Sequence, residues 1–191
     1  MNVTTQNETR APFFGGRPAF RLRHRLFRLG WRVCWILLAS WTPPQMRGWR
    51  RMLLRMFGAR MDPCSDVRAS AWVWYPPNLE MGAHSILGPG VICYNQAPVR
   101  IGCHSVISQR SHLCAGTHDF TTPDFTLVTR PIRIGDEVWV CSEAFVGPGA
   151  TLGAGTVVGA RGVVTGEVAP WTILAGNPAR PIGKRAQFGR A

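Results

Sequence analysis

The side chain that most suggests chemistry in this sequence is His118, which lies with Asp119 in the stretch "LCAGTHDF". An alcohol is a poor nucleophile at neutral pH. Imidazole, with an unperturbed pKa of about 6.5, can take the proton of a hydroxyl group and pass it on to a leaving group. Since an isolated histidine is more often structural than catalytic, the elements that position His118 decide which interpretation fits.

Aliphatic residues recur every six positions after this stretch. From residue 134 the sequence reads "IGDEVW VCSEAF VGPGAT LGAGTV VGARGV VTGEVA", and every block begins with Val, Ile or Leu. Only 38 of the 191 residues are of these three types, so six successive matches are not a chance pattern. A second register, two positions earlier, holds mostly small or β-branched residues. Two inward positions in each block predict a short strand followed by a turn, and hexapeptide repeats are typical of a parallel β-helix.

The same spacing runs upstream of His118 with two irregularities. The step from Leu87 to Ile101 is too long, which predicts two extra residues that bulge out near "CYNQAPV". The step from Leu113 to Ile134 predicts an insertion, the loop 115–129, with His118 at its root. A solenoid forces such insertions outward, and loops on rigid scaffolds tend to carry function.

Composition and patterning divide the chain into four parts. Hydrophobic residues make up 46% and charged residues 17% of the sequence, which excludes a disordered chain. We expect a flexible N-terminal tail at 1–20 and a basic amphipathic helical segment at 21–60. The β-helix, with its protruding loop, follows at 61–175, and a C-terminal cap and tail at 176–191 complete the mainly β protein.

The six cysteines contain no CxxC pair and lie in segments that otherwise look like ordinary core. We therefore expect small buried side chains in a reducing, cytoplasmic setting. The apolar run "VCWILLASW" is nine residues long, which is too short to span a bilayer, and it does not resemble a secretory signal.

The net charge of +12 comes from the N-terminal segment, because residues 10–60 hold twelve arginines and no acid. Two helical patterns follow each other there, separated by "TPPQ". In the first, an apolar stripe comprises Leu22, Leu26, Leu29, Val33, Ile36 and Leu37. Arginine-rich amphipathic helices suit the surface of an anionic membrane leaflet. Packing of the stripes on the β-helix or on another subunit is the alternative. Nucleic-acid binding is not expected, because no recognised nucleic-acid-binding fold accompanies the charge.

The ordered motifs resemble those of the hexapeptide-repeat acyltransferases. They are similar above all to the branch with maltose and galactoside O-acetyltransferases and the acetyltransferases assigned to colanic acid biosynthesis. The resemblance rests on "GWRRMLLRMFGA", "CYN", "ISQ", "THD", "IGDEVWV", "EAFVGPG", "VVGARGVVTG" and "PWTILAGNPARPIGK". It implies a left-handed β-helix and a homotrimer, with acetyl-CoA and a carbohydrate acceptor in clefts between neighbouring coils. In this family His118 would be the general base of a direct transfer, with no metal and no acyl-enzyme.

The resemblance also implies roles for other residues. Asn95 would contact the acceptor, or it is a turn asparagine. Asp119 would orient the imidazole of His118, or it caps the loop. Trp139 would lie near the reacting groups, or it only packs. The positions that would contact acetyl-CoA are Ser142, Ala160, Thr165 and Arg180.

The sequence departs from the family at Gly166, where relatives commonly carry a lysine, and Arg161 could replace that cation. Three alternatives stay open. The same base could N-acetylate an amino sugar on a nucleotide carrier, and the coil could serve only as a trimeric scaffold. A zinc-dependent carbonic-anhydrase-like protein shares the repeat and would need three histidines, with candidates at His84, His104, His112 and His118.

Overall fold

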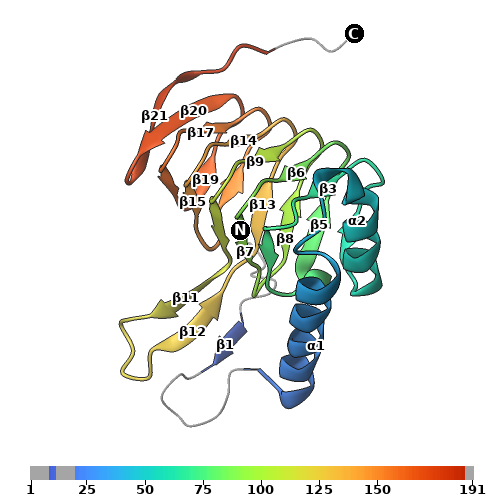
Figure 1. The fold of residues 1–191 in the computed structure, drawn as a ribbon. Coiled ribbons are helices and arrows are strands. Elements are labelled where there is room, and N and C mark those ends of the chain that lie inside the picture. The colour runs from blue at the N-terminus through green and yellow to red at the C-terminus, as the bar shows by residue number, and fades with distance from the viewer. Residues whose placement is uncertain (1–8, 12–19, 188–191) are drawn as a thin grey trace.

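The computed structural model of the chain describes residues 9–11 and 20–187, and it shows a parallel β-helix with three faces (Figure 1). The first face comprises β2 (Arg60–Met61), β5 (Leu79–Met81), β8 (Val99–Ile101), β13 (Ile132–Ile134), β16 (Thr151–Leu152) and β19 (Glu167–Val168). The second comprises β3 (Asp66–Val67), β6 (Ile86–Leu87), β9 (Val106–Ile107), β14 (Trp139–Val140), β17 (Val157–Val158) and β20 (Thr172–Gly176). The third comprises β4 (Trp72–Val73), β7 (Ile92–Tyr94), β10 (His112–Cys114), β15 (Phe145–Val146) and β18 (Val163–Val164).

Consecutive strands lie on successive faces, and each strand pairs in parallel with the strand one turn later. Val140, for example, is in register with Val158, and Val146 with Val164. The coil ends in a hairpin, because β21 (Ala179–Lys184) pairs antiparallel with β20. This hairpin covers one edge of the second face at the C-terminal end.

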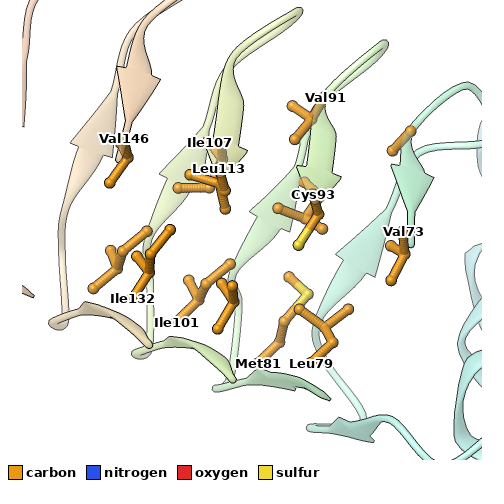
Figure 2. Close-up of a cluster of buried hydrophobic side chains, with 14 of the residues drawn as sticks. Val73, Leu79, Met81, Val91, Cys93, Ile101, Ile107, Leu113, Ile132 and Val146 are labelled. Atoms are coloured by element: carbon orange, nitrogen blue, oxygen red, sulfur yellow. The ribbon is translucent and has the colours of Figure 1, made fainter. Parts of the chain in front are cut away.

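The repeated aliphatic side chains fill the inside of the β-helix. All six positions of the predicted register are buried: Ile134, Val140, Val146, Leu152, Val158 and Val164. Figure 2 shows upstream members of the same stack, among them Leu79, Ile107 and Leu113, pointing inward from different faces. The stack therefore forms one continuous core along the axis of the coil.

Turns of unequal length explain the irregular spacing upstream. Met81 is in register with Ile101, so this turn takes twenty residues, whereas Ile134 and Leu152 enclose a turn of eighteen. Buried Cys93 occupies an inward position between Leu87 and Ile101 that the aliphatic pattern did not reveal. The extra residues lie at the corner between the third and first faces, within the predicted "CYNQAPV" segment.

The same corner carries the predicted loop, and the loop is a β-hairpin. It consists of β11 (Gly116–Asp119) and β12 (Thr126–Thr129), and it projects away from the coil (Figure 1). The amide of Arg130 donates a 2.9 Å hydrogen bond to the carbonyl of Ala115, which closes the base of the hairpin. The coil resumes at β13.

A strand from the N-terminal region braces this hairpin. β1 (Thr9–Ala11) pairs antiparallel with β12, so the hairpin becomes a three-stranded sheet. β1 falls inside the segment 1–20, for which the sequence predicted a flexible tail. The prediction missed this pairing, and the remainder of that segment, residues 1–8 and 12–19, lies outside the described residues.

Two helices cover the N-terminal end and one side of the coil. They are α1 (Leu22–Leu38) and α2 (Arg47–Met56), with short 3₁₀ helices η1 (Pro44–Met46) before α2 and η2 (Pro76–Asn78) before β5. None of the helices in the described part of the chain is long and apolar enough to cross a membrane.

A buried arginine docks α2 onto the coil. The guanidinium of Arg50 is completely buried and donates hydrogen bonds to the carbonyls of Val67 and Pro43, at 2.8 Å each, and to the hydroxyl of Thr42. Asp66 lies 3.4 Å away and supplies the opposite charge. A buried cation costs little only when it is satisfied in this way, so Arg50 fixes where α2 sits.

Candidate active site

His118 lies on β11, in the hairpin, and its imidazole is held by the backbone of the same hairpin. Its Nδ1 lies 2.8 Å from the carbonyl oxygen of Phe125, at the far end of the turn. A carbonyl oxygen only accepts hydrogen bonds, so Nδ1 carries the proton in this contact. The neutral ring then has its lone pair on Nε2, which is the arrangement a general base needs.

The backbone at Phe125 is unusual, because its φ of +46° lies in the left-handed region that non-glycine residues seldom adopt. This conformation aims the Phe125 carbonyl back toward β11. This contact could not be predicted from the sequence, because its acceptor is a backbone oxygen, which every residue type has. The only available signal was the position of His118 at the root of an insertion.

Asp119 follows His118 but makes different contacts. Its carboxylate accepts hydrogen bonds from the amide of Thr121, at 3.0 Å, and from the hydroxyl of the same residue. Its carbonyl accepts from the amide of Thr122. These contacts favour the loop-capping interpretation of Asp119, and the carbonyl of Phe125 contacts the imidazole.

Asn95 lies at the hairpin's corner of the coil, and it is fully buried. Its Oδ1 accepts a 3.0 Å hydrogen bond from the amide of Tyr75, and its Nδ2 donates a 2.8 Å hydrogen bond to the carbonyl of Tyr75. The carbonyl of Asn95 accepts from the side chain of Asn78. The side-chain amide of Asn95 thus takes the place of strand hydrogen bonds between two successive coils of the β-helix. This favours the interpretation of Asn95 as a turn asparagine over a role in acceptor binding.

The other predicted positions lie on other parts of the coil. Trp139 stands on the second face, about half exposed, and its indole donates a 2.9 Å hydrogen bond to the hydroxyl of Ser108. Ser142 and Ala160 occupy equivalent corners of successive turns, where the Ser142 carbonyl accepts from the amide of Arg161. Among the described residues, no hydrogen bond or ion pair joins Trp139, Ser142 or Ala160 to the hairpin that carries His118.

Thr165 and Arg180 line a common groove at the C-terminal end of the coil. The groove has a volume of about 440 Å³ and lies between β18, β19, β20 and β21. Lys184 lines it as well and donates a 3.0 Å hydrogen bond to the hydroxyl of Thr172. Glu167 lines the groove too, so its lining keeps a net positive charge, which suits a ligand with phosphate groups. Sequence reasoning missed Lys184, although it lies within the quoted motif "PWTILAGNPARPIGK".

Gly166, where relatives commonly carry a lysine, and Arg161, which could replace that cation, differ in their surroundings. Gly166 has a φ of +84°, a conformation that favours glycine over lysine, although the space beyond its Cα is open. Arg161 is engaged with Glu143, at 2.7 Å, and Arg110 contacts the same carboxylate. The hydrogen bond from Arg161, together with the charge of Arg110, lowers the pKa of Glu143 from its ordinary value. Lys184 is therefore a better placed substitute cation than Arg161.

The histidines considered as zinc ligands do not converge within the described residues. His84 and His104 stack on each other in successive turns, with ring centroids 4.8 Å apart. His112 packs edge-on against Phe145, and burial lowers its pKa. In residues 9–11 and 20–187, no group of three or more histidine, cysteine or acidic side chains is arranged to hold a metal ion.

Solved structures with the same fold include acetyltransferases. A hexapeptide-repeat-containing acetyltransferase of Vibrio cholerae O1 biovar eltor, complexed with acetyl coenzyme A, superposes with a TM-score of 0.79 at 23% identity over 89% of this chain and 93% of that one. A maltose O-acetyltransferase of Clostridium difficile 630 superposes with a TM-score of 0.77 at 22% identity, over 87% and 90% of the two chains. These likenesses confirm the predicted left-handed β-helix.

A curated relative decides the family. "Putative colanic acid biosynthesis acetyltransferase WcaF" of Escherichia coli strain K12 is 40% identical over 157 residues, which cover 82% of this chain and 86% of that protein. The chain belongs to the hexapeptide-repeat acetyltransferase family. No family model matches the sequence. As a member of this family the chain is an acetyltransferase, which confirms the predicted enzyme class.

The buried amide of Asn95 generates a test. The variant Asn95→Ala leaves the amide and carbonyl of Tyr75 without partners inside the corner, so we expect a loss of about 1–3 kcal/mol in the free energy of unfolding. Urea denaturation followed by circular dichroism measures it. Gln109→Ala, at an exposed position, is the control and should change stability little. Unchanged stability in Asn95→Ala would restore the acceptor-binding interpretation.

Proposed function

We propose that the chain is an acetyl-CoA-dependent O-acetyltransferase that modifies a hydroxyl of a carbohydrate, with His118 as the general base. The observation that carries this proposal is the hydrogen bond from Nδ1 of His118 to the carbonyl of Phe125, because it places the accepting lone pair on Nε2. The direct transfer needs neither a metal nor an acyl-enzyme.

The proposed reaction follows from this placement. Acetyl-CoA supplies an acetyl group on a thioester, whose carbonyl carbon is open to attack. Nε2 of His118 takes the proton as the acceptor oxygen forms its bond to that carbon. The carbon–sulfur bond breaks, and the proton passes from the imidazolium to the departing thiolate. Since the Phe125 carbonyl accepts from Nδ1–H throughout, it also stabilises the transient positive charge on the ring.

The remaining predicted residues are assigned to the co-substrate and the acceptor. We assign Ser142 and Ala160 to contacts with acetyl-CoA along the corner of the coil. Thr165 and Arg180, joined by Lys184, would hold the phosphate-bearing part in the groove of about 440 Å³. Trp139 would lie against the acceptor or the thioester, and its exposure of 49% leaves a ring face available for that contact.

A homotrimer is part of the proposal. The hairpin projects from the coil and exposes two phenylalanines, Phe120 and Phe125, while the second face exposes Trp139 and Val106. Large apolar side chains on a projecting arm are typical of subunit contacts. If the arm reaches a neighbouring coil, His118 of one subunit meets Trp139 of another, which a single chain does not bring together.

The acceptor class rests on the relatives. The relative WcaF is named for colanic acid biosynthesis and a structural neighbour for maltose, so a sugar hydroxyl is the acceptor that we propose. A lipid-linked or surface-polysaccharide intermediate at the inner face of the cytoplasmic membrane fits the basic helices of the N-terminal segment. Peripheral contact with that membrane is therefore included in the proposal.

His118→Ala tests the catalytic assignment. We expect the rate of acetyl transfer to fall by about 10²–10⁴-fold, because proton removal from the acceptor loses its base. The measurement is chromatographic quantification of free CoA over a panel of mono- and oligosaccharides, including amino sugars. Acetyl-CoA binding, measured by calorimetry, should remain unchanged.

The control for this variant is His104→Ala, since His104 is an exposed histidine outside the hairpin. A His118→Ala protein that keeps its rate would overturn the general-base assignment. So would an acetylated protein that mass spectrometry detects as an intermediate. Transfer to amino sugars alone would replace the hydroxyl acceptor with an amine.

Arg180→Gln and Lys184→Gln test the groove. Each variant should raise the Kd for acetyl-CoA by about tenfold or more, since a hydrogen bond to a charged group is worth about 1.5–3 kcal/mol. Isothermal titration calorimetry measures the change. Arg60→Gln, at the opposite end of the coil, removes the same charge outside the groove and should leave the Kd unchanged. If the unmodified protein and all three variants bind acetyl-CoA with the same affinity, the co-substrate binds outside this groove.

A further inference from the structure

The outer face of α1 is apolar and exposed. Six aliphatic residues of this helix are between 47% and 65% exposed: Leu22, Leu26, Leu29, Val33, Ile36 and Leu37. Their spacing of three, four or one places them along one side of the helix, and we call this set the α1 stripe. A continuous apolar surface of this kind is uncommon on a soluble monomer and indicates a partner.

The opposite side of α1 is the one that packs on the coil. Trp31 and Trp35 are buried, and their indoles donate hydrogen bonds of 2.8 Å and 3.2 Å to the carbonyls of Val73 and Ala69. These contacts fix the rotation of the helix about its axis. The alternative in which the stripe packs on the chain's own β-helix is therefore wrong.

Cations border the α1 stripe on both sides. At about 100° of rotation per residue, Arg23 lies on one flank, and Arg25 and Arg32 lie on the other. All three are exposed, and no ion pair joins them to another residue in the described part of the chain. Just beyond the stripe, Trp41 is 69% exposed. Tryptophan is enriched where a bilayer meets water.

A groove beside the stripe adds one further cationic group, that of Arg28. It lies between α1 and β4, has a volume of about 260 Å³, and is lined by Arg28, Arg32, Ile36 and several tryptophans. The guanidinium of Arg28 stacks over the ring of Trp74, 4.2 Å from its centroid. Arg32 and Ile36 belong both to the groove and to the surface around the stripe. A phosphate at this surface would meet guanidinium groups that bind it well.

We propose that α1 docks an anionic lipid bilayer, lying parallel to its surface with the stripe among the acyl chains and the flanking arginines among the headgroup phosphates. The helix has 17 residues and is about 25 Å long, so it suits an interfacial position rather than a span. A second copy of this face is a poor partner, because two arginine-rich flanks would meet without an acid between residues 10 and 60. The proposal does not rest on the chemistry of acetyl transfer.

Flotation with lipid vesicles tests the proposal on the full chain. We expect binding to vesicles of phosphatidylcholine and phosphatidylglycerol in equal parts at low salt, with at least tenfold weaker binding to phosphatidylcholine alone. Salt at about 0.5 M should weaken the binding to anionic vesicles, because it screens the arginine–phosphate attraction. Phosphatidylserine in place of phosphatidylglycerol should bind comparably, since both headgroups carry a net negative charge that phosphatidylcholine lacks.

Two triple variants separate the two contributions. Leu26→Gln with Leu29→Gln and Ile36→Gln should reduce the partition coefficient at least tenfold. Arg23→Gln with Arg25→Gln and Arg32→Gln should remove the preference for anionic lipid. Ile182→Gln, at an isolated exposed isoleucine, is the control and should bind like the unmodified chain. Circular dichroism and acetyl-CoA titration check that each variant remains folded.

The outcome that overturns the proposal is equally direct. If the unmodified chain fails to float with anionic vesicles at low salt, α1 does not dock a bilayer. If, in addition, light scattering shows that the variant with Leu26, Leu29 and Ile36 replaced by glutamine no longer forms the oligomer of the unmodified chain, the stripe is a subunit interface. Loss of catalysis in His118→Ala leaves both outcomes unaffected, so this test and that of the acetyl transfer fail independently.

Discussion

The packing of aliphatic side chains along the inside of the β-helix is the interaction on which the remaining structure depends. Each side of the coil admits a fixed number of inward residues, so surplus residues must leave at a corner. Here they leave at the corner between the third and first faces, where Asn95 replaces missing strand pairing and where the hairpin β11–β12 emerges. A continuous core on either side of that corner gives the hairpin a rigid base. The excursion that interrupts the repeat is thus the element that carries the candidate base.

The imidazole of His118 depends on these constraints, because a backbone carbonyl of the hairpin sets its orientation. The left-handed conformation of Phe125 and the pairing of β12 with β1 hold the carbonyl that contacts Nδ1 of His118. Asp119 closes the turn of the hairpin. The groove that suits phosphate lies at another part of the coil, lined by Arg180 and Lys184. The site between two subunits that we propose would bring these separate locations together.

The sequence predicted the features that repetition enforces. Six-residue spacing yielded the β-helix and the place of the insertion, because an interior position tolerates only a few residue types. It was harder to predict the roles of Asn95, Asp119 and the base of the hairpin. These roles depend on hydrogen bonds to backbone groups, which are the same for nearly all residue types. The orientation of α1 was also undetermined, because its leucine stripe and its tryptophan face are both apolar. Hydrogen bonds from Trp31 and Trp35 to the coil decided between them. Likewise β1 could not be foreseen, since its pairing joins segments more than a hundred residues apart.

We propose that backbone geometry fixes the tautomer of His118 so that Nε2 accepts the proton. Long-range proton–nitrogen correlation spectra of ¹⁵N-histidine-labelled protein report this tautomer directly, with His118→Ala identifying the resonance. Recorded at pH 8, where an ordinary imidazole is neutral, the spectrum should show a protonated Nδ1 and an unprotonated Nε2 for His118. A predominant tautomer with the proton on Nε2 would overturn the general-base role of His118, since that nitrogen would then be a donor and could not take the acceptor's proton.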